Sequence, residues 1–138
     1  MDELKIIPTL TVETQPYWDA CQQETLLLQQ CKECDHIQFY PRLMCSKCSS
    51  REVGWIESSG FAKVLTYTIV HRPILPAYQK EAPYILALVQ LEEGPTMMTN
   101  IVNCPHETIN CNLQVKVLFQ PWSEDFLVPV FEPLLFCI

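Results

Sequence analysis

The sequence has few charged residues, little positive charge and no long apolar run. Charged residues make up 18% of its 138 residues and apolar residues 49%. A disordered chain shows the opposite balance, so a packed core is expected. Only 9 residues are basic against 16 acidic ones, and the resulting net charge of -7 disfavours general binding to nucleic acid. No stretch approaches the roughly 18 apolar residues of a membrane span.

Glycine is also scarce, with 3 residues, whereas 11 prolines are spread along the chain. Prolines at such intervals divide a chain into short elements and argue against a helical bundle. The N-terminal residues lack the basic segment and apolar run of a signal peptide. We therefore expect a soluble, cytoplasmic protein of one domain, or of two small units that share a core.

Four of the eight cysteines form two pairs, in each of which two residues separate the sulfurs: Cys31, Cys34, Cys45 and Cys48. Such a pair places both sulfurs on one side of a tight turn, and two facing turns form a tetrahedral cage for Zn²⁺. The intervening residues suffice for one hairpin, as in a zinc ribbon. A closed cage of four cysteines has no position for water, so the zinc is expected to be structural.

Other uses of these four cysteines remain open at this point. Two disulfides or a redox-active pair are disfavoured because the chain shows no sign of secretion. The same cage could hold iron instead of zinc. Asp35 and Ser49 follow the two pairs at positions where glycine is common, and Asp tolerates a left-handed backbone better than most residues.

The remaining cysteines show no metal-binding pattern: Cys21, Cys104, Cys111 and Cys137. A second site built from Cys104, His106 and Cys111 is conceivable, but ordinary loop and strand positions are the favoured interpretation. No histidine lies in a local catalytic signature with a cysteine. Two adjacent carboxylate pairs, at 92–93 and 124–125, are expected to lie in solvated turns and not to form an acid–base dyad.

The predicted fold is mainly β, with an N-terminal helix, a zinc ribbon and a five-stranded barrel. Thr14, Pro16 and apolar residues at helical spacing predict a helix over 15–24, with Trp18 packed inward. Strands are expected in the ribbon at 26–30, 37–40 and 53–56. Strands are expected in the barrel at 61–70, 84–91, 97–102, 113–120 and 128–131.

The barrel strands predict a closed Greek-key arrangement such as an OB-fold, with a sandwich fragment as the alternative. The strand at 84–91 is nearly all apolar and is expected to be fully buried. The predicted units are an arm and helix at 1–25, the ribbon at 26–56, and the barrel with an apolar tail at 57–138. Ten of the thirteen residues from Phe126 onward are apolar, so the tail beyond the last strand should fold back or be covered by a partner.

The order of these motifs resembles a known family. The shared motifs are Tyr17-Trp18, the two cysteine pairs, Phe39-Tyr40-Pro41-Arg42, Trp55, Ser59-Gly60, Thr66, Pro83-Tyr84 and the end of the following strand at 91–94. Together they resemble the family of small acyl-CoA-associated proteins that combine a rubredoxin-like zinc ribbon with an OB-fold. The similarity covers about residues 13–131.

The resemblance implies a function as well as a fold. It implies a non-catalytic accessory or bridging subunit that forms a hetero-oligomer with a thiolase-like, ketosynthase-like or hydratase-like enzyme acting on CoA thioesters. The metal ligands are then the four paired cysteines. Many relatives carry a glycine in the turn that here reads 109–112, where Asn can supply a positive φ.

Direct binding of acyl-CoA would need local positive charge for its phosphates. Five of the nine basic residues are expected near the junction of ribbon and barrel: Arg42, Lys47, Arg51, Lys63 and Arg72. The candidate acyl-CoA site is therefore Arg42, Lys63 and Arg72, with Trp55 or Tyr67 as a stacking surface; ordinary solvated charges are the alternative. Two other functions are weighed, a single-stranded nucleic-acid-binding OB-fold and a rubredoxin-like electron carrier.

Overall fold

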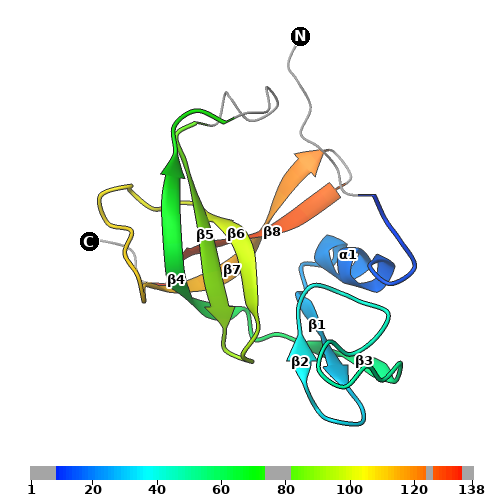
Figure 1. Ribbon diagram of the computed structural model, residues 1–138. Coiled ribbons are helices and arrows are strands. Elements are labelled where there is room, and N and C mark those ends of the chain that lie inside the picture. The colour runs from blue at the N-terminus through cyan, green and yellow to red at the C-terminus, as the bar shows by residue number, and fades with distance from the viewer. Residues whose placement is uncertain (1–8, 74–81, 124–125, 135–138) are drawn as a thin grey trace.

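The chain folds into a small three-stranded sheet and a closed barrel, with one helix packed between them (Figure 1). The computed structural model describes residues 9–73, 82–123 and 126–134. Its elements are α1 (Gln15–Gln22), β1 (Leu27–Cys31), β2 (Ile37–Gln38), β3 (Val53–Glu57), β4 (Phe61–Val70), β5 (Tyr84–Leu91), β6 (Thr96–Ile101), β7 (Gln114–Ser123) and β8 (Phe126–Pro133). No helix of this described part is long and apolar enough to cross a membrane.

The first sheet belongs to the predicted ribbon and has the antiparallel order β2-β1-β3. The strand expected over 37–40 is shorter than predicted, because β2 ends at Gln38. Phe39 and Tyr40 leave the sheet, and their rings pack against the ring of Tyr17 in α1 with centroid distances of 5.6 Å each. Aromatic packing onto the helix therefore competes successfully with strand pairing here.

The second sheet closes into a five-stranded barrel with the order β4-β5-β6-β8-β7. Neighbouring strands are antiparallel except β6 and β8, which are parallel. Alternate side chains point into the barrel, and Val64, Val89, Val115 and Phe131 are completely buried there. The predicted OB-fold is confirmed.

Two expectations about the barrel strands are wrong in part. Strand β5 is not buried on both faces: its side chains alternate between buried and half-buried, so Leu86 and Leu88 point outward. The last strand is longer than predicted, because β8 spans Phe126–Pro133 and buries Val128, Val130 and Phe131 in the core. Much of the apolar C-terminal run is thus barrel wall, while residues 135–138 lie outside the described part.

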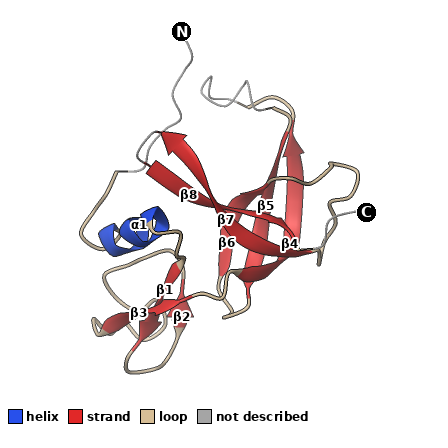
Figure 2. Cartoon of the chain, turned by 180° about the vertical axis from the view of Figure 1, so that it is seen from behind, coloured by secondary structure: helices blue, strands red, loops and turns tan. Residues whose placement is uncertain are grey.

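Helix α1 joins the ribbon to the barrel (Figure 2). It buries Tyr17, Trp18 and Cys21, as its apolar spacing predicts. The side-chain amide of Gln22 donates to the carbonyl of Leu127 in β8 at 3.2 Å and accepts from the Leu127 amide at 2.8 Å. Burial raises the pKa of the Cys21 thiol to about 12, so this cysteine is a packing residue without nucleophilic character.

Candidate metal centre and ligand groove

The four predicted metal ligands converge in the ribbon. The sulfurs of Cys31, Cys34, Cys45 and Cys48 all lie within 4.8 Å of one another. Cys31 Sγ is 3.5 Å from Cys48 Sγ, and Cys34 Sγ is 3.6 Å from Cys45 Sγ. A tetrahedral site with zinc–sulfur bonds of about 2.3 Å has sulfur–sulfur edges of about 3.8 Å. The cage therefore has the dimensions that zinc requires.

Each cysteine pair lies on a turn whose backbone points at a sulfur. The amides of Glu33 and Cys34 lie 3.4 Å from Cys31 Sγ, and the Lys47 amide lies 3.3 Å from Cys45 Sγ. Asp35 and Ser49 close the two turns with φ values of 63° and 66°. The predicted left-handed backbone at these glycine-like positions is confirmed.

The four sulfurs cannot all ionise without a compensating cation. Backbone N–H groups, first that of Cys48 and then that of Lys47, lower the pKa of Cys45 to about 7, although burial of the thiol opposes them. The Ser50 amide also lowers the pKa of Cys48, but the neighbouring Cys31 sulfur, burial and the other two thiols raise it to about 12. A divalent ion supplies the missing positive charge, and this closed set of sulfur donors fits structural zinc.

The other cysteines do not extend this site. Among the residues that the structure describes, these four are the one cluster suited to a metal, and all the described cysteines are free of disulfides. Cys104 Sγ lies 3.4 Å from the Thr108 hydroxyl, in a loop. Cys137 and the carboxylate pair at 124–125 lie outside the described residues.

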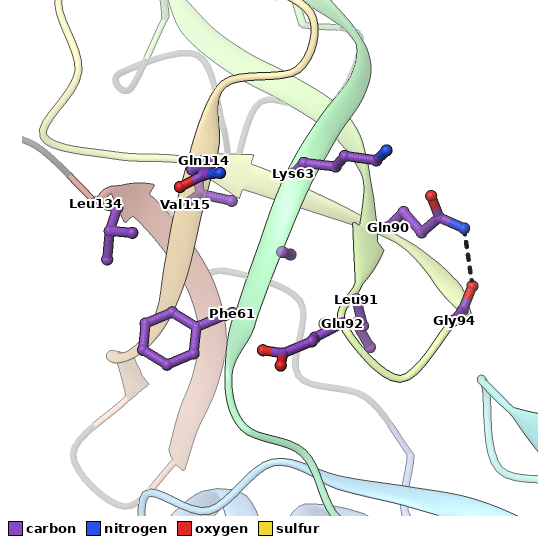
Figure 3. A pocket seen from close by; sticks show the side chains of 10 residues that line it. Phe61, Lys63, Gln90, Leu91, Glu92, Gly94, Gln114, Val115 and Leu134 are labelled. Carbon is purple, nitrogen blue, oxygen red and sulfur yellow. Dashed lines mark hydrogen bonds between the residues drawn. The ribbon is translucent and has the colours of Figure 1, made fainter.

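The barrel carries an open groove of about 640 Å³ (Figure 3). Its walls come from the start of β4, the end of β5 and the turn after it, the start of β7, and Leu134. Phe61 is 45% exposed there. Lys63 contributes the groove's positive charge and Glu92 a negative one, so the charges of this groove offset one another.

One of the four candidate acyl-CoA residues lines this groove. Lys63 lines the groove, whereas Arg42, Trp55 and Arg72 are not among its lining residues. Arg72 follows the far end of β4 from Lys63, which corresponds to roughly 30 Å along an extended strand. Trp55 is half-buried against the core. Acyl-CoA binding by these residues therefore remains a prediction.

A feature that sequence reasoning missed holds the ribbon to the barrel. Glu93, in the turn between β5 and β6, accepts hydrogen bonds from the Ser58 hydroxyl and the Ser59 amide, both at 2.8 Å. Glu92 accepts a third from the Ser59 hydroxyl at 3.0 Å. The pair lies in a turn with Glu92 exposed, as expected, but its carboxylates also bind the linker between the two sheets, which the sequence does not reveal.

Comparison with known proteins gives matches over most of the chain. Residues 18–54 match a family described as "ChsH2, rubredoxin-like zinc ribbon domain", and residues 55–120 match "ChsH2, C-terminal OB-fold domain". A DUF35 domain-containing scaffold protein of Methanocaldococcus jannaschii is 38% identical over 97 residues, which cover 69% of this chain and 67% of that protein.

Two further relatives carry names that refer to enzymes. A probable enoyl-CoA hydratase alpha subunit of Thermomonospora curvata is 29% identical over 126 residues; the match covers 91% of this chain but only 39% of that subunit. A chain of a solved structure titled "Ltp2-ChsH2(DUF35) aldolase" superposes with a TM-score of 0.85 at 29% identity and covers 94% of this chain and 100% of that one. The chain therefore belongs to the DUF35 family, whose zinc ribbon and OB-fold domains it contains in that order.

Proposed function

We propose that this chain is a non-catalytic scaffold subunit of an enzyme complex that acts on acyl-CoA thioesters. The observation that carries the proposal is a partly apolar face on the outside of the barrel, formed by β4, β5 and β6 and bordered by Lys63. Such a face is costly to leave in water and is typical of a surface that a partner covers.

Strand register defines this face. Thr66, Leu88 and Met98 are cross-strand neighbours in one row, and Thr68, Leu86 and Asn100 form the next. Met98 is 64% exposed, and Leu65, at a bulge in β4, is 38% exposed. Helix α1 packs against β8 and β1. It therefore does not cover the outward-facing Leu86 and Leu88 of β5.

The names of the relatives agree with a scaffold role. One relative of 38% identity is named a scaffold protein, and another, of which the chain spans 39%, is named a hydratase alpha subunit. The partner we propose is a thiolase-like, ketosynthase-like or hydratase-like enzyme, with which the chain forms a hetero-oligomer in the cytoplasm. In this proposal the zinc is structural, and acyl-CoA is a ligand shared with the partner at the groove near Lys63.

The test is isolation of a tagged copy from its own cells, followed by identification of stoichiometric partners and assay of their activity on acyl-CoA thioesters. We expect one acyl-CoA enzyme, whose activity falls when the chain is removed. Met98→Glu should release the enzyme, because it places a charge in the apolar face. Val12→Glu is the matched control, since Val12 is 87% exposed and lies outside that face.

Other outcomes would contradict the proposal. A chain that is recovered alone, or an enzyme that binds Met98→Glu as tightly as the unaltered chain, would argue against this face as the scaffold surface. Retention on single-stranded DNA at low salt would favour the nucleic-acid alternative. A red protein that contains iron would favour the electron-carrier alternative.

A further inference from the structure

Two buried glutamines in the ribbon hold a loop that points into solvent. Gln29 of β1 and Gln38 of β2 are paired across the sheet and are only 4% and 5% exposed. The Gln38 amide donates to Gln29 Oε1 at 2.8 Å. Buried amides of this kind are costly unless their hydrogen bonds are made.

Both amides also bind the backbone of one segment, residues 39–44, which we call the ribbon loop, and Gln38 Oε1 accepts from the Ser46 amide just beyond it at 2.8 Å. Gln29 accepts from the Arg42 amide at 2.7 Å and donates to the Arg42 carbonyl at 2.9 Å. Gln38 donates to the Met44 carbonyl at 3.2 Å. The backbone of the ribbon loop is therefore fixed from inside the sheet.

Helix α1 fixes the other end of the ribbon loop. The Trp18 indole donates to the Tyr40 hydroxyl at 3.0 Å, and the rings of Phe39 and Tyr40 pack against Tyr17. The loop is thus held by hydrogen bonds at one end and by aromatic packing at the other. The loop therefore loses little conformational freedom when its side chains bind a partner.

The side chains that this rigid loop presents are apolar and basic. Leu43 is 67% exposed, Met44 40% and Tyr40 38%. Residues 41–51 contain three basic side chains and no acidic one, in a chain whose net charge is -7. Within the described part of the chain, Arg42 forms no ion pair. Exposed Tyr, Met and Arg on a pre-ordered backbone are typical of an interface hot spot.

From these contacts we propose that the ribbon loop is a second docking surface for the partner enzyme. The loop inserts into an apolar recess on that enzyme, and carboxylates border the recess. The recess takes Leu43 and Met44, and the carboxylates pair with Arg42. This inference rests on the proposed scaffold function and assigns to it a second surface, on the ribbon. A phosphate ligand is the less favoured occupant, because it would leave Leu43 and Met44 in water.

The experiment uses the complex isolated through the tagged chain and hydroxyl-radical labelling of its methionines. Met44 should be labelled at least about five times more slowly in the complex than in the isolated chain.

Leu43→Asp should reduce the recovered enzyme at least about tenfold, since it puts a charge into the apolar recess. Val12→Asp makes the same change at an exposed site outside the loop and should leave recovery unchanged. Zinc content and thermal unfolding of both variants should match the unaltered chain, because both side chains are exposed.

The salt dependence of complex formation tests the proposed pairing of Arg42 with the carboxylates that border the recess. Arg42→Gln should weaken the complex at low salt and flatten its salt dependence. If the enzyme is recovered but Met44 is labelled as fast as in the free chain and Leu43→Asp still binds, the ribbon loop is not the docking surface and the scaffold function stands. If no enzyme is recovered, both ideas fail. Protection of Met44 by CoA alone would make a nucleotide the occupant and overturn the protein recess.

Discussion

Glu93 in the β5–β6 turn holds Ser58 in the linker that leaves the ribbon, with 2.8 Å between its carboxylate and the Ser58 hydroxyl. The second carboxylate oxygen accepts the amide of Ser59 at the same distance. One side chain thus fixes two consecutive linker residues, and β4 begins at Phe61, directly after Gly60. This contact and the hydrogen bonds between Gln22 and Leu127 both fix the relative position of ribbon and barrel, on which a scaffold with two surfaces depends.

We predict that Glu93→Gln destabilises the protein at pH 7. The neutral amide weakens two hydrogen bonds that a charged acceptor makes strong, and because Glu93 is half-exposed the loss is about 1 kcal/mol. Chemical unfolding measures it. Glu92→Gln, which alters one 3.0 Å bond to the Ser59 hydroxyl, is the control and should cost less. An equal loss of unfolding free energy in both variants would mean that Glu93 stabilises the linker no more than Glu92 does.

The Glu93 carboxylate should also make the stability of the protein depend on pH. Partial burial alone raises the pKa of Glu93, but hydrogen bonds from the Ser59 amide and the Ser58 hydroxyl outweigh it, and the pKa lies below its ordinary value of 4.5. The contribution to stability is therefore complete above pH 4.5 and is lost as the pH falls through the lower, folded pKa. The difference in unfolding free energy between Glu93→Gln and the unaltered chain should shrink over that interval; a constant difference would contradict the assignment.

Removal of two zinc ligands should unfold the ribbon. In the double variant Cys31→Ser/Cys34→Ser, bound zinc should fall from about one ion per chain to about none, because the ion replaces a hydrophobic core there. Elemental analysis measures the metal, and near-ultraviolet circular dichroism the loss of aromatic packing around Tyr17. Cys111→Ser, at an exposed cysteine outside the cage, should keep the metal. Retained zinc with an unchanged fold would refute the structural role.

The sequence predicts those parts of the molecule that depend on local spacing. The cysteine pairs predict the cage, short runs of apolar, aromatic and β-branched residues predict the barrel strands, and Asp35 is compatible with a left-handed turn that the structure has at φ 63°. Each of these signals lies within a few residues of the feature that it predicts. The resemblance to a family predicts the order of helix, ribbon and barrel along the chain.

Features that depend on contacts across the fold are not predicted. Gln29 and Gln38 occupy strand positions where a polar residue is expected to face solvent, yet both are buried because their amides pair with each other and with the ribbon loop. Glu93 lies more than thirty residues from Ser58. Likewise, the length of β8 depends on its partner β7, because residues 126–133 have no alternation strict enough to mark the strand.

Asn112 allows a test of what a positive φ costs in the turn before β7. Asn112 has a φ of 72°, and its amide donates to the Val64 carbonyl at 2.6 Å. Asn112→Val should cost about 1–2 kcal/mol, since a β-branched residue tolerates this conformation poorly, whereas Asn112→Gly should change stability by less than about 0.5 kcal/mol. Thermal and chemical unfolding measure both. Asn110→Val, in the same loop but without a positive φ, is the control; an equal loss there would mean that exposure of valine, and not backbone strain, is responsible.

Gly60 lies where the linker enters the barrel, and substitution there should be more costly. Its φ is 86°, and a Cβ atom would lie 2.8 Å from Val117 Cγ1 in β7. Gly60→Ala should therefore cost about 2–4 kcal/mol, the sum of a left-handed backbone and an overpacked contact. Gly94→Ala has a φ of 116° but no neighbour within 4 Å of the added atom, so it should show only the backbone cost of about 1–2 kcal/mol.

A double-mutant cycle separates the two costs at Gly60. Val117→Ala removes the methyl group that a new Cβ would meet, so it should recover the steric part of the loss when combined with Gly60→Ala, and urea unfolding of all four proteins measures the coupling. The recovered part should equal the difference between Gly60→Ala and Gly94→Ala. Strictly additive losses would mean that the chain shifts to avoid Val117, and that the contact with this side chain contributes nothing to the cost of Gly60→Ala.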